Sequence, residues 1–185
     1  PKGLYVLFFT EMWERFGYYL MVGILFLFMT NSSGKGLPKA MGADVVGTFI
    51  ALVYLTPFIG GLLADRYLGY IKSIFIGGAL MAAGYLTIAL PGEYTAYIAM
   101  GLIIVGNGFF KPNISTLLGN LYNWEDLRPL KDNAYNIFYM GINIGAFFCN
   151  FVAAILRNRI GWQAAFSAAG VGLIIGLIAL AFNLR

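Results

Sequence analysis

The chain has 185 residues, of which 60% are hydrophobic and only 11% are charged. Soluble domains are about 45–50% apolar and about 25% charged, so this composition leaves too little polar surface to coat a water-soluble fold. The net charge of +4 comes from scattered basic residues without a basic run, so no nucleic-acid partner is expected. There is no histidine and one cysteine, Cys149, which excludes an internal disulfide and a cysteine-based metal site, and neither a metal nor another cofactor is expected.

Six apolar runs follow one another along the chain, each long enough to cross a bilayer as a helix of about 20 residues. They cover residues 4–29, 44–64, 72–90, 94–121, 133–156 and 162–184. A β-barrel would need segments of about 10 residues with alternating polarity, which these runs lack. We therefore predict an all-α, multi-pass membrane protein in which residues 1–185 form one six-helix transmembrane bundle surrounded by membrane lipid.

The basic residues between the runs favour a cytoplasmic N-terminus. With that orientation the cytoplasmic side carries six of them and the other side four: Lys2, Arg66, Lys72, Arg128, Lys131 and Arg185 against Lys35, Lys39, Arg157 and Arg159. The positive-inside rule then predicts an N-in protein, and we expect it in the plasma (inner) membrane. Small residues at a spacing of four, Gly141 with Gly145 and Gly172 with Gly176, indicate closely packed helices.

The first apolar run contains charges near its middle, where residues 11–16 read EMWERF. Three charged side chains at the centre of a membrane helix cost about 8–10 kcal/mol on insertion scales. At about 100° per residue, five polar side chains share an arc of roughly 140° on one helix face. They are Glu11, Glu14, Arg15, Tyr18 and Tyr19. Such groups are functional by default inside a membrane, whereas buried ion pairs that merely lock helices together are poor stabilisers.

Two further anomalies lie in later runs. Lys111 is deep in the fourth run, with Asn107 one turn before it, and Tyr54 precedes Pro57 in the second. The fifth run carries a polar stripe on one helix face, which could equally be asparagines that only bond across helices. Its members are Asn136, Tyr139, Asn143 and Asn150.

Glu11 and Glu14 balance Arg15 and Lys111 when all four are ionised. A proton taken by one carboxylate would free a cation to hold an anionic group of a substrate, and burial beside a like charge favours that proton. Residues 61–72, which read GLLADRYLGYIK, place Asp65 where a helix C-terminus disfavours an acid, so an outside partner is expected there.

At these residues the chain resembles the proton-dependent oligopeptide transporter family of the major facilitator superfamily, along essentially its whole length. The EMWERF segment matches the family's E-x-x-E-R-F motif, and residues 138–145, FYMGINIG, match its second signature. KPN at 111–113 matches the lysine motif of its fourth helix, and residues 61–72 resemble the superfamily signature between helices 2 and 3.

The resemblance implies proton-coupled symport of di- and tripeptides by alternating access, with protons as the coupling ion. Arg15 would hold the C-terminal carboxylate of the peptide, and Lys111 would share that role and take part in proton coupling. Glu11 and Glu14 would handle protons, without an indication of which one carries the transported proton. The peptide site would also be lined by Tyr18, Tyr19, Tyr54 and Asn143.

The resemblance further implies that Asp65, with Arg66 beside it, belongs to a gating network on the cytoplasmic side. The family fold has twelve helices in two halves, so we expect a C-terminal six-helix half, absent from this chain, as a partner. A facilitator-fold carrier of another anionic or zwitterionic solute and a non-transporting peptide receptor stay open as alternatives. An intramembrane enzyme is not expected, because no serine or cysteine lies beside a base and no metal ligands cluster.

Overall fold

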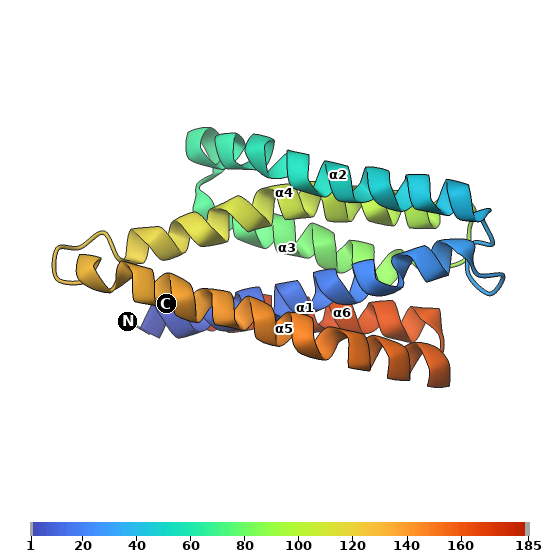
Figure 1. Ribbon diagram of the computed structural model, residues 1–185. Helices are drawn as coiled ribbons and strands as arrows, with labels where there is room; N and C mark the ends of the chain where they lie inside the picture. Colours follow the sequence, from blue (N-terminus) through green and yellow to red (C-terminus); the bar gives the residue numbers. More distant parts are fainter. Residues whose placement is uncertain (1, 184–185) are drawn as a thin grey trace.

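The computed structural model describes residues 2–183, and within that range it contains helices and no strands (Figure 1). The long helices are α1 (Lys2–Thr30), α2 (Lys39–Leu63), α3 (Tyr70–Thr87), α4 (Thr95–Leu121), α5 (Lys131–Arg159) and α6 (Trp162–Asn183). A π-helical segment, η1 (Ala64–Leu68), continues α2, and a 3-10 turn, η2 (Arg128–Leu130), leads into α5. The prediction of an all-α membrane protein is confirmed by this architecture.

Five of the six long helices are long and apolar enough to cross a membrane. The one outside this group, α4, has 27 residues but interrupts its apolar run with polar side chains, Asn107, Lys111 and Asn113 among them. Its length still exceeds the roughly 20 residues that a crossing requires. The polar groups of α4 therefore need partners inside the protein.

Several helix ends differ from the ranges read off the apolar runs, most of all the start of α2 and the ends of α3 and α5. α2 begins at Lys39, five residues before position 44. Pro38, immediately before it, is compatible with the start of a helix, and the helix includes residues 39–44 although Lys39 and Asp44 are charged. α5 begins at Lys131 and ends at Arg159, so both of its ends extend beyond the apolar run into charged residues. Hydrophobicity marks the part of a helix that lies in lipid, whereas backbone hydrogen bonding carries the helix further.

The helices pack in two groups, one of α2, α3 and α4 and the other of α1, α5 and α6. α1 packs against α5 and α6, α4 packs against α2 and α3, and α3 contacts α6. Figure 1 shows α2 and α5 at opposite edges of the bundle, with both chain ends at one end of it. α1 is mostly buried while α2 and α5 are mostly exposed, so α1 is an internal helix.

Glycines allow the closest helix crossings. A side chain at Gly145 of α5 would collide with the backbone of α1 at Met12 and Phe16, and one at Gly60 of α2 would collide with the backbone of α4 at Gly108. Without side chains at these points the backbones approach directly, as small residues permit in membrane helices. The two crossings hold α1 against α5 and α4 against α2.

Candidate functional site

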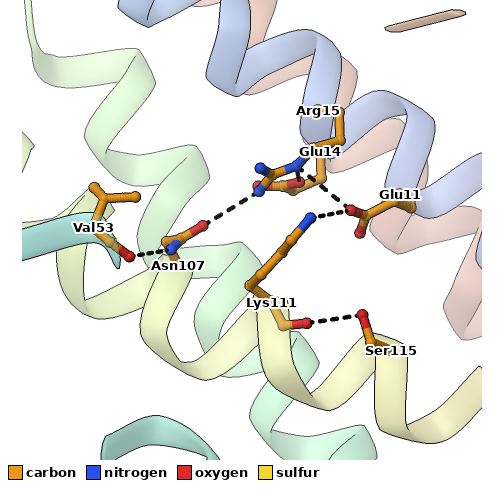
Figure 2. Close-up of polar contacts among 7 residues, drawn as sticks. All are labelled: Glu11, Glu14, Arg15, Val53, Asn107, Lys111 and Ser115. Carbon is orange, nitrogen blue, oxygen red and sulfur yellow. Dashed lines mark hydrogen bonds and ion pairs between the residues drawn. The ribbon is translucent and has the colours of Figure 1, made fainter. Parts of the chain in front are cut away.

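Charged side chains of α1 are buried in the middle of the bundle. Glu11 and Glu14 are fully buried, and Arg15 is 6% exposed. The helical spacing of these residues turns all three toward α4, as Figure 2 shows. Their burial agrees with the rule that ionised groups inside membranes face protein rather than lipid.

Arg15 forms its closest ion pair with the neighbouring residue in the chain. Its Nε and Nη2 donate hydrogen bonds to the two carboxylate oxygens of Glu14, which is the fork-like arrangement that guanidinium and carboxylate groups favour. Nε of Arg15 also lies 3.5 Å from Oε1 of Glu11, one helical turn earlier. Glu11 is therefore a second, more distant partner of Arg15.

Lys111 joins the same group of charges from α4. Its Nζ donates to Oε1 of Glu11 at 2.8 Å, although the two residues are 100 positions apart in the chain. The Glu11 side chain is fully buried, whereas that of Lys111 is 32% exposed. Among the described residues the other oxygen of Glu11, Oε2, has no hydrogen-bond partner. Glu11 thus retains one free acceptor in a buried position.

We name Glu11, Glu14, Arg15 and Lys111 the charge cluster. Two anions face two cations, so the cluster is neutral when all four side chains are ionised. Neutrality explains how four charged groups survive away from water, since an uncompensated buried charge is far more costly than a paired one. Adding one proton or one anionic ligand would leave a net charge that must be balanced.

Asn107, one turn before Lys111 on α4, also contacts the charge cluster. Its Oδ1 accepts a hydrogen bond from Nη2 of Arg15 at 3.3 Å, and its Nδ2 donates to the backbone oxygen of Val53 on α2 at 2.9 Å (Figure 2). In the sequence Asn107 stands out only as a neighbour of Lys111, and it is not among the predicted site residues. A polar residue in register with Lys111 inside an apolar helix was the available signal.

A small cavity of about 100 Å³ adjoins the charge cluster. Its lining residues are Arg15, Tyr18, Val53, Tyr54, Pro57, Asn107 and Lys111. Ligand sites usually enclose about 300–1,000 Å³, so this cavity is only part of a site for a small organic molecule. A larger cavity of about 830 Å³ lies among the loops at the C-terminal end of α1, and no residue of the charge cluster lines it.

Two tyrosines of α1 accompany Arg15. The guanidinium carbon of Arg15 lies 4.8 Å from the ring centre of Tyr18 and 6.0 Å from that of Tyr19. Both distances fall within the range of cation–π attraction. Tyr18 is buried and lines the cavity, whereas Tyr19 is 37% exposed and is not among the lining residues.

The remaining predicted peptide-site residues lie at the edge of the cavity or away from it. Tyr54 lines the cavity but is 76% exposed on α2. Asn143 is exposed on α5 and does not line the cavity, and the other members of the polar stripe on α5 are exposed as well. Asp65 and Arg66 are exposed within η1 at the far end of α2, outside the charge cluster.

The loop after η1 reverses the chain at Gly69. This residue has φ 77°, a left-handed conformation that glycine adopts without strain, and it connects η1 directly to α3. Over residues 2–183 no group of three or more histidine, cysteine, aspartate or glutamate side chains could hold a metal ion.

A helical bundle with ionised groups buried between its membrane helices has the construction of a secondary transporter. A sequence model of the POT family (PTR2) matches residues 71–184, and the chain belongs to this family. The chain is 40% identical, over 97% of its length, to the di-/tripeptide transporter of Lactococcus lactis. It is 42% identical, over 99% of its length, to the uncharacterized transporter YclF of Bacillus subtilis.

Solved structures of the family have the same fold. The chain superimposes with a TM-score of 0.94 on a peptide transporter POT in complex with alafosfalin, at 39% identity over 99% of this chain. It superimposes equally well, at 33% identity over the whole chain, on a POT family transporter in complex with 5-aminolevulinic acid. The resemblance seen in the sequence motifs is thereby confirmed, and the chain is an integral, multi-pass membrane protein.

The chain corresponds to well under half of these proteins. It spans 37–38% of the length of the two relatives and 38% of each of the two solved chains. The packing of α1 against α5 and α6, and of α4 against α2 and α3, agrees with the inverted three-helix repeats expected inside one six-helix half of a facilitator-superfamily transporter.

Proposed function

We propose that this chain, paired with a second six-helix half, carries out proton-coupled symport of di- and tripeptides by alternating access. The relatives named as di- and tripeptide transporters and the family's complex with the peptide-like ligand alafosfalin support this proposal. The charges of this chain's own residues support the proposal as well, because Lys111 and Arg15 share one oxygen of Glu11.

The observation that carries the proposal is the meeting of Lys111 and Arg15 at Oε1 of Glu11. In this arrangement each cation is held by a carboxylate of α1. Binding of a peptide would bring a new carboxylate beside Arg15, and the excess negative charge would be balanced by a proton on Glu11 or Glu14. A buried site that must stay neutral thus links peptide binding to proton uptake.

Arg15 has donors to offer such a carboxylate. The hydrogen bonds that it forms among the described residues use Nε and Nη2, which leaves the two N–H groups of Nη1 for a ligand. Lys111, partly exposed toward the cavity, would approach the same carboxylate. Tyr18 and Tyr54 would form the walls beside it, while Tyr19 and Asn143 would contribute from exposed positions.

The second half is part of the proposal because the cavity is too small for a peptide. In such folds the substrate lies between two halves near the middle of the membrane. The exposed faces of α2 and α5 are the surfaces available to meet the second half. We further propose a cytoplasmic N-terminus in the inner membrane, with Asp65 and Arg66 acting in a gate on the cytoplasmic side.

Uptake by proteoliposomes tests the proposal. The complete transporter should accumulate a labelled dipeptide when a pH gradient is imposed, and unlabelled di- and tripeptides should compete. Arg15→Ala should abolish uptake because it removes the side chain that binds the C-terminal carboxylate of the peptide. Glu14→Gln should abolish the accumulation that the pH gradient drives. Uptake that continues unchanged after the gradient is collapsed by a protonophore would refute proton coupling.

A second candidate function is transport of another anionic or zwitterionic solute. The similarity to a family member in complex with 5-aminolevulinic acid, which carries one amine and one carboxylate, favours keeping it. Failure of all dipeptides to compete, together with uptake of such a solute, would favour this alternative. Peptide binding without any uptake would instead indicate a receptor.

A further inference from the structure

Asn107 forms hydrogen bonds to two different helices, one through its side-chain oxygen and one through its side-chain nitrogen. Its oxygen accepts from Nη2 of Arg15 on α1, and its nitrogen donates to the backbone oxygen of Val53 on α2. Asn107 is 2% exposed and Val53 is 3% exposed, so both groups are shielded from bulk water. This one side chain of α4 therefore connects α1 to α2 (Figure 2).

The backbone oxygen of Val53 needs this donor because of a proline. In an α-helix the oxygen of residue 53 would accept from the amide of residue 57, but Pro57, inside α2, has no N–H. A buried carbonyl without a partner is strongly destabilising. Asn107 supplies the missing donor from α4.

The chemistry of its two partners sets the orientation of the amide. A backbone carbonyl can only accept and a guanidinium can only donate, so the nitrogen of Asn107 must face Val53 and its oxygen must face Arg15. The amide cannot flip without losing both hydrogen bonds. Arg15 thus faces an acceptor whose position is fixed by α2.

The crossing of α2 and α4 contains a second proline, and the carbonyl oxygen that it frees has different surroundings. Pro112 in α4 frees the backbone oxygen of Gly108, and this oxygen lies against Gly60 of α2, where the absence of a side chain gives it room. Among the described residues no side-chain amide donates to the oxygen of Gly108. On the other side, where Arg15 lies, Asn107 both satisfies the oxygen of Val53 and contacts the charge cluster.

We propose that Asn107 is a positioning residue for Arg15, anchored to α2 through the carbonyl that Pro57 frees. This inference rests on the proposed function, in which Arg15 holds the peptide carboxylate. The Asn107 bond to Val53 is the shorter of its two hydrogen bonds, and the bond to Arg15 is the longer. Asn107 thereby holds Arg15 in place, while Nη1 of Arg15, which forms no hydrogen bond among the described residues, is left to bind the arriving carboxylate.

The test compares a dipeptide with its C-terminal amide in the complete transporter. Asn107→Leu should raise KM for the dipeptide about tenfold with kcat little changed, because a hydrogen bond to a charged group has been lost. The preference for the free carboxylate over the amide should shrink by a similar factor. Asn113→Leu is the matched control, since buried Asn113 also lies on α4 but donates only to the oxygen of Phe109 on its own helix.

Two further variants separate positioning from helix packing. Asn107→Asp keeps an oxygen beside Arg15 but loses the donor to Val53, and its negative charge competes with the substrate carboxylate for Arg15. KM for the dipeptide should therefore rise again, while the amide is less affected. In a Pro57→Ala background the new amide at residue 57 satisfies Val53, so Asn107→Leu should destabilise the protein less in thermal unfolding. Its effect on KM should persist.

The possible results are distinct. Equal losses for the dipeptide and the amide, or a KM effect that vanishes together with the stability effect in the Pro57→Ala background, would reduce Asn107 to a structural role and overturn the inference. Asn107→Leu and Asn107→Asp kinetics like those of the unaltered protein would also overturn it. A complete transporter that takes up no dipeptide at all would refute the proposed function, which is a different outcome.

Discussion

Lys111 of α4 donates from Nζ to Oε1 of Glu11 on α1 at 2.8 Å, and the same oxygen lies 3.5 Å from Nε of Arg15. One carboxylate oxygen therefore serves two cations from two helices. Neutralising Glu11 would weaken both contacts together. This relationship makes the contact between α1 and α4 sensitive to a single proton.

Replacing Lys111 by methionine should remove proton-driven peptide uptake, with at least a tenfold loss of rate. The change keeps the length of the side chain but leaves Glu11 without its closest cation, and an unpaired buried charge is strongly unfavourable. Uptake of labelled dipeptide under a pH gradient measures the effect. Lys131→Met is the control, because Lys131 bonds only Asn123 at an exposed position, and it should transport normally. Full activity of Lys111→Met would exclude Lys111 from coupling.

Arg15→Lys should lose most transport although it keeps the positive charge. Lysine cannot form the two-pronged contact that Arg15 makes with Glu14 while also reaching Asn107. We expect KM for a dipeptide to rise about tenfold or more, as the loss of one or two charge-assisted hydrogen bonds implies. Kinetics measured over a range of peptide concentrations would show this. Normal KM in the lysine variant would mean that charge alone suffices at this position.

Gly145→Leu should weaken the contact between α1 and α5. The added side chain would collide with the backbone of α1 at Met12 and Phe16, and overpacking of this kind costs about 1–3 kcal/mol. The midpoint of thermal unfolding in detergent should therefore fall by several degrees. Gly47→Leu provides the comparison, because a Cβ at Gly47 meets nothing within 4 Å in this chain. A similar loss in both variants would contradict specific packing at Gly145.

The proposed orientation can be read from thiol labelling of intact cells. A membrane-impermeant maleimide should label Ser32→Cys, in the exposed loop after α1, and should not label Glu125→Cys, in the exposed loop after α4. The natural Cys149 is fully buried and should contribute no signal. The parent protein gives the background, and disrupted cells should label both variants. Labelling of Glu125→Cys alone in intact cells would reverse the orientation.

Part of the fold was predictable because membrane insertion is a local property of the chain. The apolar runs located the helices, since each run buries its own backbone hydrogen bonds in lipid. Hydrophobicity could not predict where the polar ends of the helices lie. α2 starts at Lys39 because a helix continues as long as its backbone hydrogen bonds do, whatever the polarity of its side chains.

The candidate site was partly predictable for a similar reason. Glu11, Glu14 and Arg15 stand out because charges in an apolar helix are costly, and their spacing puts them on one face. The same reasoning marked Lys111 but assigned it no partner. Asn143 stood out as a member of the polar stripe, but its role in a peptide site came from the resemblance alone. The structure leaves Asn143 exposed on α5, so that role stays a prediction.

The sequence by itself determined that this chain is a membrane helix bundle and which charges it must shelter, because hydrophobicity and helical periodicity act over a few turns. Only the tertiary structure decided the partners. Lys111 reaches Glu11 across 100 positions, and Asn107 meets Arg15 and Val53 across 92 and 54 positions. Those contacts depend on where glycines and prolines let α1, α2 and α4 approach, and that crossing geometry arises only when the helices pack together.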